Sequence, residues 1–220
     1  MKLRSSALIG AVLLTAAGCG QPNNVTLLKH GNHSMYQERW SDAADDFEKA
    51  TKQHPGDWEA QYNLGQCLLK LGNPEKASQA LAIAESLRPY NNAIADSYAE
   101  ALLKSGNRNK LFSFLQGRAQ KQQTVRAWTR FAEYAMDIDD PDSATNAINT
   151  AIAISDGTNA APYITSATFA ERLGDDSLAV KRWSEAWMID PSNEMVSNSL
   201  RSHGVVPGPT MTGAVEDSQQ

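Results

Sequence analysis

A spacing of 34 residues recurs along this chain and constrains the fold more than any other feature of the sequence. Pro55 and Pro89 are 34 residues apart, and Pro191 lies 102 residues beyond Pro89, which is three more periods. A fixed period of about 20–50 residues is typical of stacked-repeat proteins, in which each unit buries its apolar face against its neighbours. The period predicts five repeats, at residues 24–57, 58–91, 92–124, 125–158 and 160–193.

Small residues occupy three positions of these repeats, the eighth, the twentieth and the twenty-seventh. Thirteen of the fifteen residues there are Gly or Ala, which make up only about a fifth of the chain. Small side chains let two antiparallel helices approach to the short end of the usual interaxial range, about 8–10 Å. The twenty-fourth position instead holds a large residue that can fill the space between the helices. The small residues are Gly31, Gly65, Ala99, Ala132, Ala167, Ala43, Ala77, Ala144, Ala179, Ala50, Ala84, Ala151 and Ala186, and the large ones are Phe47, Leu81, Leu115, Ile148 and Trp183.

Turn residues separate two predicted helices in each repeat. In the second repeat, Gly72 can end one helix, Asn73 can cap the next, and Pro74 suits its first turn. Residues 59–65, with the sequence EAQYNLG, closely resemble the first-helix motif of the tetratricopeptide repeat family, whose repeat is about 34 residues long. The resemblance implies an all-α fold, a right-handed α-solenoid of about five helix pairs spanning residues 24–203.

Residues 194–203 are predicted to form a capping helix, with Met195, Val196 and Leu200 covering the open end of the last repeat. The third repeat departs from the pattern, because Leu111 and Arg118 replace small residues. We therefore expect its second helix to be displaced or bent. Residues 204–220 contain Pro and Gly and no periodic apolar face, which predicts a disordered tail.

The N-terminus is typical of an export signal. Residues 1–18 combine two basic residues, an apolar stretch at 7–17 and small residues before Cys19. The apolar stretch is shorter than the roughly 20 residues that a membrane-spanning helix needs. Residues 14–19, LTAAGC, resemble the lipobox of bacterial lipoproteins, although Ala16 stands where that family usually has Leu. The resemblance implies a lipid on Cys19 and a linker at residues 19–23; the alternative is ordinary cleavage that releases a soluble exported protein.

The destination implied by this resemblance is the outer membrane, on its periplasmic side, because Gly20 replaces the Asp that typically retains lipoproteins in the inner membrane. The formal net charge of −5 is a poor match to nucleic acid and to anionic lipid. Membrane association would therefore depend on the lipid.

No set of residues predicts an enzyme, a cofactor or a small-molecule substrate. His30 and His33 lie one helical turn apart and suggest a metal site, but the sequence offers no third ligand nearby. The carboxylates of residues 137–142 suggest calcium, but the segment lacks the Gly and Glu of an EF-hand loop. Cys67 is interpreted as a packed side chain rather than a nucleophile, because no spaced His would activate it.

The tetratricopeptide resemblance implies a concave groove, lined by the first helix of each repeat, that takes an extended peptide or a partner's helix. Arg126 and Arg130, one turn apart, suggest contact with an acidic segment of a partner. A clamp for C-terminal carboxylates, known in one subfamily, is matched by Asn32 and Asn63 but not by the cations of the third repeat. The family's groove positions correspond to Lys29, Asn32, Tyr36, Tyr62, Asn63, Gln66, Lys70, Glu100, Arg126, Arg130, Glu133 and Arg172.

These patterns together predict a membrane-anchored scaffold that mediates protein–protein interactions in the bacterial cell envelope. One alternative is a pilotin-like lipoprotein that assists assembly of a pilus or secretion complex. Another is a regulator of a cell-wall enzyme. A solute-binding lipoprotein fits less well, because small-ligand pockets bury most of their ligand and a solenoid groove is open.

Overall fold

A computed structural model describes residues 22–208, which form eleven α-helices and no strand. The predicted signal peptide, Cys19 and residues 209–220 of the predicted tail lie outside the described residues. None of the helices at residues 22–208 combines the length and the apolar character needed to cross a membrane. The helices are α1 (Asn24–Tyr36), α2 (Trp40–Gln53), α3 (Trp58–Lys70), α4 (Pro74–Leu87), α5 (Asn92–Lys104), α6 (Arg108–Gln122), α7 (Val125–Asp137), α8 (Pro141–Ser155), α9 (Ala161–Leu173), α10 (Asp176–Ile189) and α11 (Glu194–Ser202).

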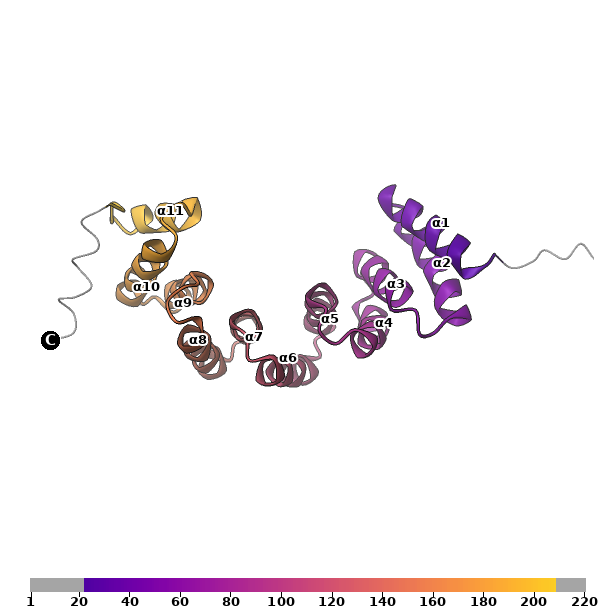
Figure 1. The fold of residues 1–220 in the computed structure, drawn as a ribbon, viewed down its shortest axis with the longest axis horizontal. Coiled ribbons are helices and arrows are strands. Elements are labelled where there is room, and N and C mark those ends of the chain that lie inside the picture. Colours follow the sequence, from indigo (N-terminus) through magenta and orange to yellow (C-terminus); the bar gives the residue numbers. More distant parts are fainter. Residues whose placement is uncertain (1–21, 209–220) are drawn as a thin grey trace, which may run out of the picture.

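Consecutive helices pack as pairs, and the pairs stack along an open arc (Figure 1). The first helices α3, α5, α7 and α9 lie on the inner side of this arc, and the second helices α4, α6, α8 and α10 lie on its outer side. Each predicted repeat contains one pair. The prediction of an all-α solenoid of helix pairs is therefore confirmed.

The core lies between the two helices of each repeat, at the small residues that the sequence singled out. All eleven alanines at the three small positions have no exposed surface. The large residues of the twenty-fourth position are buried against them, from Phe47 and Leu81 at 0% exposed to Leu115 and Ile148 at 3%. Small and large side chains therefore interdigitate in the same way in the first, second, fourth and fifth repeats.

Glycine at the eighth position allows the closest of these approaches. A Cβ atom placed on Gly65 would lie 2.4 Å from Cγ of Leu81, which is the branch point of that side chain. A Cβ on Gly31 would lie 2.8 Å from the ring of Phe47. In the first two repeats, the large residue thus occupies the space that any other residue's Cβ would need.

Helix α6 of the third repeat packs less closely on its partner α5 than the second helix does in any other repeat. Leu111 is fully buried where the other repeats have Ala. Arg118, whose side chain is 9% exposed, donates to Glu85 Oε1 of α4 at 2.7 Å, to Asn92 Oδ1 of α5 at 3.0 Å, and to the carbonyl of Pro89. Hydrogen bonds therefore attach α6 where other repeats use contacts between alanines.

The carboxyl group of Glu85, which pairs with Arg118, lies in an environment that disfavours its ionised form. Burial raises the pKa of Glu85 to about 7, although the guanidinium of Arg118 lowers it. Its second oxygen, Oε2, is buried and has no hydrogen-bond partner in the protein. The junction of the second and third repeats thus contains an ion pair in a site that favours neutral groups.

Helix α11 covers the open end of the last repeat through Val196 and Leu200, which are fully buried beside Trp183. The prediction that Met195 joins them is wrong, because Met195 is 51% exposed. Val196 and Leu200 are four residues apart and share one helix face, whereas Met195 points about 100° away from Val196. Gly204, with φ 76°, ends the helix, and Val205 N–H donates to the Leu200 carbonyl at 2.9 Å.

The packing at Gly65 gives a test of stability. Gly65→Ala should destabilise the chain by about 1–3 kcal/mol, because the new methyl group overlaps Leu81. Gly117→Ala in α6 is the matched control: its Cβ would meet nothing within 4 Å, so helix propensity should stabilise the chain by about 0.5–1 kcal/mol. Urea unfolding measures both changes, and equal effects of the two substitutions would contradict the proposed packing.

Candidate protein-binding groove

The predicted groove residues lie on the first helices, which line the inner side of the arc (Figure 1). Each of them is exposed or half-buried, so each is accessible to a partner. Tyr36, at the end of α1, is 88% exposed. The positions carried over from the family resemblance therefore share one surface.

Polar contacts join every pair of neighbouring first helices along this surface. Asn63 Nδ2 of α3 donates to Asn32 Oδ1 of α1 at 3.1 Å, and Gln66 of α3 donates to Ser97 Oγ of α5. At the other end of the groove, Arg172 of α9 lies 3.7 Å from Asp137 of α7. We call this series of contacts between first helices, together with the α5–α7 contacts described next, the polar ladder.

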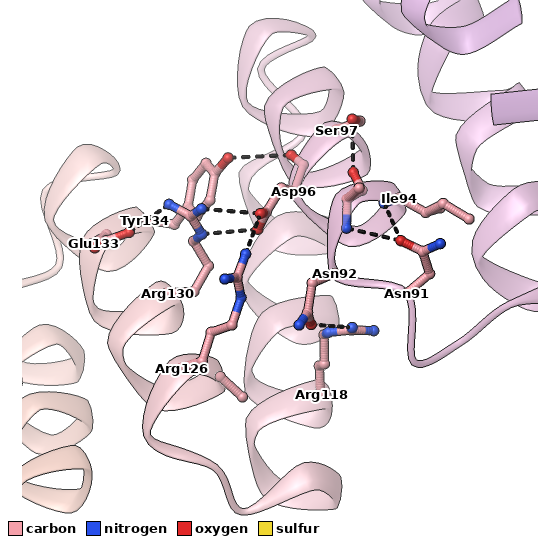
Figure 2. A network of polar contacts seen from close by, with 12 residues as sticks. Asn91, Asn92, Ile94, Asp96, Ser97, Arg118, Arg126, Arg130, Glu133 and Tyr134 are labelled. Atoms are coloured by element: carbon pink, nitrogen blue, oxygen red, sulfur yellow. Dashed lines mark hydrogen bonds and ion pairs between the residues drawn. The ribbon is translucent and has the colours of Figure 1, made fainter. Parts of the chain in front are cut away.

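The largest group of contacts in the ladder is centred on Asp96 of α5 (Figure 2). Arg130 of α7 donates to both of its carboxylate oxygens, from Nε at 2.9 Å and from Nη2 at 3.1 Å. Arg126 donates to Oδ2 from Nη2 at 3.0 Å. Arg130 also donates from Nη1 to Glu133 Oε2 at 2.7 Å. Two cations and two carboxylates therefore balance one another at the centre of the groove.

The charges of this network shift the pKa values of two side chains on α7. Burial lowers the pKa of Arg130, but the hydrogen bond to Asp96 and the charges of Glu133 and Asp96 raise it by more, so the net shift is upward. Burial raises the pKa of the neighbouring Tyr134 hydroxyl to about 12, and the negative charges nearby add to this although Arg130 opposes it. Arg130 is therefore a permanent cation and Tyr134 a permanent neutral phenol at physiological pH.

Arg126 and Arg130, which were both predicted to contact an acidic segment of a partner, differ in exposure and in internal contacts. The side chain of Arg130 is 38% exposed, and its two hydrogen bonds to Asp96 connect α7 to α5, while its bond to Glu133 lies within α7. The side chain of Arg126 is 61% exposed and uses a single nitrogen, Nη2, in its bond to Asp96. Because a guanidinium has five N–H donors, most of those of Arg126 remain available to a partner.

Two other predicted groove residues also have internal contacts. The ammonium group of Lys70 lies 5.9 Å from the ring centroid of Trp40. Glu100 accepts a hydrogen bond from Lys104 at 2.6 Å, one turn along α5. Such exposed pairs contribute little to stability, so both side chains can turn towards a partner at low cost.

The comparisons with known proteins agree with this geometry. Residues 28–92 match the sequence model described as tetratricopeptide repeat. The match covers most of the first two predicted repeats. No curated protein sequence matches the chain.

Several solved structures share the fold beyond the matched residues. A thermophilic TPR protein of Thermus thermophilus superposes with a TM-score of 0.54 at 19% identity, over 82% of this chain and 98% of that one. MamA from Desulfovibrio magneticus gives 0.59 at 14% identity, over 78% and 97%. YrrB, described as a TPR protein with an unusual peptide-binding site, gives 0.55 at 14% identity, over 83% and 93%.

The side chains with potential reactivity or metal affinity have structural positions in the solenoid. Cys67 is fully buried, and burial raises the pKa of its thiol to about 11, which disfavours the reactive thiolate. His33 contacts Gln37 on the exposed side of α1 at 2.9 Å. Asp140 caps α8 by accepting from Ser143 N–H at 3.1 Å. Among residues 22–208, no three potential metal ligands lie together.

The Asp96–Arg130 contact predicts measurable coupling. In a double-mutant cycle of Asp96→Ala and Arg130→Ala, we expect a coupling free energy of about 1 kcal/mol, because two hydrogen bonds between charged groups are lost together and the groups are about one-third exposed. The exposed pair Glu100 and Lys104 is the control, with an expected coupling below about 0.5 kcal/mol. Denaturant unfolding of the four variants measures each value.

Proposed function

We propose that this chain is a scaffold that binds protein partners in the groove lined by α1, α3, α5, α7 and α9, and that it is anchored in the bacterial cell envelope by a lipid on Cys19. The polar ladder supports the first part of this proposal, the binding of protein partners in the groove. It holds groove side chains such as Asn63, Gln66 and Arg130 in fixed positions while leaving them accessible. Side chains that are already ordered lose less conformational entropy when a partner binds.

The open shape of the groove favours a macromolecular partner. A small ligand gains affinity from a pocket that buries most of its surface, whereas an extended segment or a helix can lie along several repeats at once. Solved relatives support this use of the fold, since YrrB is described as having a peptide-binding site. The fold also argues against an enzyme, because matched residues 28–92 are repeats rather than a catalytic family.

The lipid anchor is proposed from the lipobox resemblance, and the position of Pro22 adds a geometric consequence. The carbonyl of Pro22 accepts a hydrogen bond from Gln53 of α2 at 3.0 Å, so the chain is attached to the solenoid three residues after Cys19. Three residues reach at most about 11 Å. A lipid on Cys19 would therefore hold the first repeat next to the membrane surface, on the periplasmic side of the outer membrane.

Site-specific crosslinking in intact cells tests the binding groove. A photoreactive phenylalanine analogue at Tyr36, an exposed residue of α1 in the groove, should crosslink to a reproducible protein partner. The same analogue at Ile83, which is 43% exposed on the outer helix α4, is the control and should not give that product. No reproducible product from Tyr36, or the same product from both positions, would argue against a groove-bound partner.

Fractionation of cells tests the anchor. Cys19→Ser should move the full chain from the membrane fraction to the soluble fraction, because acyl chains contribute about 0.8 kcal/mol per buried methylene and serine cannot carry the thioether. Cys67→Ala is the matched control; it removes the other cysteine, which is buried, and should leave the chain in the membrane fraction. A wild-type chain found in the soluble fraction would contradict lipidation.

A further inference from the structure

Helix α6 carries a charge unlike that of the rest of the chain. Its four charged side chains, Arg108, Lys110, Arg118 and Lys121, are all cations, whereas no other described helix has more than two cations. The formal net charge of the whole chain is −5, so this excess of positive charge is local. Helix α6 lies on the outer side of the arc, away from the groove (Figure 1). The outer surface of the third repeat is therefore basic in an otherwise acidic protein.

Three of these cations are available to a partner. Arg118 forms an ion pair inside the fold. Arg108, Lys110 and Lys121 are exposed and form no ion pair within the part of the chain that the structure describes. The ammonium group of Lys110 lies 5.7 Å from the ring centroid of Tyr98, a contact that steadies the side chain without neutralising it. An acidic partner can therefore reach these cations without breaking an internal ion pair.

A cleft of about 420 Å³ opens beside this basic surface, between α6 and the segment that follows α4. The side chains of Tyr90, Phe114 and Lys121 line it. Gly117 also lines it, and a Cβ atom there would meet nothing within 4 Å, so the cleft has space for a side chain from another molecule. Tyr90 is 76% exposed, whereas the ring of Phe114 is held edge-on by Tyr98 at 4.8 Å between centroids. The cleft thus offers two aromatic rings to an apolar side chain.

The net charge of the cleft is positive. Glu85 and Arg118 also line it, but they form an ion pair at 2.7 Å and neutralise each other. Burial raises the pKa of Glu85 to about 7, and protonation of its carboxyl group would only add to the positive charge. Lys121 is the remaining charged residue among those that line the cleft. The cleft therefore attracts a carboxylate.

The basic and the apolar residues of this surface recur at helical spacing. Lys110, Phe114, Gly117 and Lys121 are separated by four, three and four residues, so they share one face of α6 within about 60° of arc. The two lysines are eleven residues apart, which is about 16 Å along the helix. A helix laid along α6 would therefore meet a cation near each end and an open cleft between them.

We propose that the outer face of α6 docks a helix of a partner protein, one that carries two acidic residues about three turns apart and a large apolar side chain between them. The carboxylates pair with Lys110 and Lys121, and the apolar side chain enters the cleft between Tyr90 and Phe114. Gly117 lets the partner approach closely, because it has no side chain. This face lies on the opposite side of the arc from the groove, so the proposal does not depend on the function proposed for the groove.

The charge of this face selects among the possible occupants. A second copy of the chain docked through its own α6 would bring four cations against four, which is repulsive. An anionic membrane would pair with the lysines, but a lipid surface has no side chain to place in the cleft. An acidic helix of a different protein uses both the charge and the cleft.

Peptide titration of the full chain in detergent tests the proposal. The probe is a blocked sixteen-residue peptide of Ala and Gln that carries Glu at its third and fourteenth positions and Leu at its seventh. It should bind at least about five-fold more tightly than the same peptide with Gln in place of both Glu residues, because two exposed ion pairs contribute about that factor. Equal affinity of these two peptides, or no binding of the Glu peptide at about 1 mM, would overturn the proposal.

A third peptide, with Ala in place of Leu, distinguishes the cleft from a general attraction of anions. It should bind about five-fold more weakly than the Glu peptide, because it leaves the cleft empty. Equal affinity would mean that α6 attracts any anionic surface, including a membrane, and the docking of a specific helix would be wrong.

Substitutions in the chain locate the binding surface. Lys110→Gln and Lys121→Gln should each weaken binding of the Glu peptide about two- to three-fold, and the two together about five-fold. Gly117→Leu fills the cleft without a clash of its Cβ, so it should weaken binding at least about five-fold while leaving the melting temperature unchanged or higher. Lys181→Gln removes an exposed cation of the outer helix α10 and is the control, which should leave the affinity unchanged. A Gly117→Leu chain that binds as tightly as the wild type, or equal effects of Lys181→Gln and Lys121→Gln, would contradict the proposed surface.

Discussion

The architecture depends on how closely the two helices of each repeat approach. Gly or Ala at the contact positions removes the side-chain volume that would hold the helices apart, and one large residue per repeat fills the remaining space. Because this geometry recurs in four of the five repeats, the pairs stack on one another and curve into an arc. The curvature places the first helices on the inner side, and so it creates the groove.

Local sequence patterns predict those parts of the fold in which each repeat packs on itself. The prolines and the small residues identified the helix pairs, because each repeat buries its own contact positions. The same pattern marked the third repeat as irregular through Leu111 and Arg118. It could not identify the partners of Arg118, because Glu85 lies 33 residues away and meets it only after α6 has taken its position. Met195 was misplaced for a similar reason, since the rotation of α11 is set by its packing.

The groove likewise has features that the sequence predicts and features that depend on packing. Family positions placed Arg126, Arg130 and Glu133 on one surface, but the bond of both arginines to Asp96 depends on how α5 and α7 are rotated relative to each other. The lipid on Cys19 is a prediction from sequence alone.

The polar ladder has a consequence for the strength and the speed of binding. A partner that uses Asn63, Gln66 or Asp96 must replace a hydrogen bond that already exists, so it exchanges one bond for another and gains little net energy at each step. Affinity then comes from the number of repeats covered rather than from any one contact. Such a surface would discriminate between partners by the placement of their polar groups.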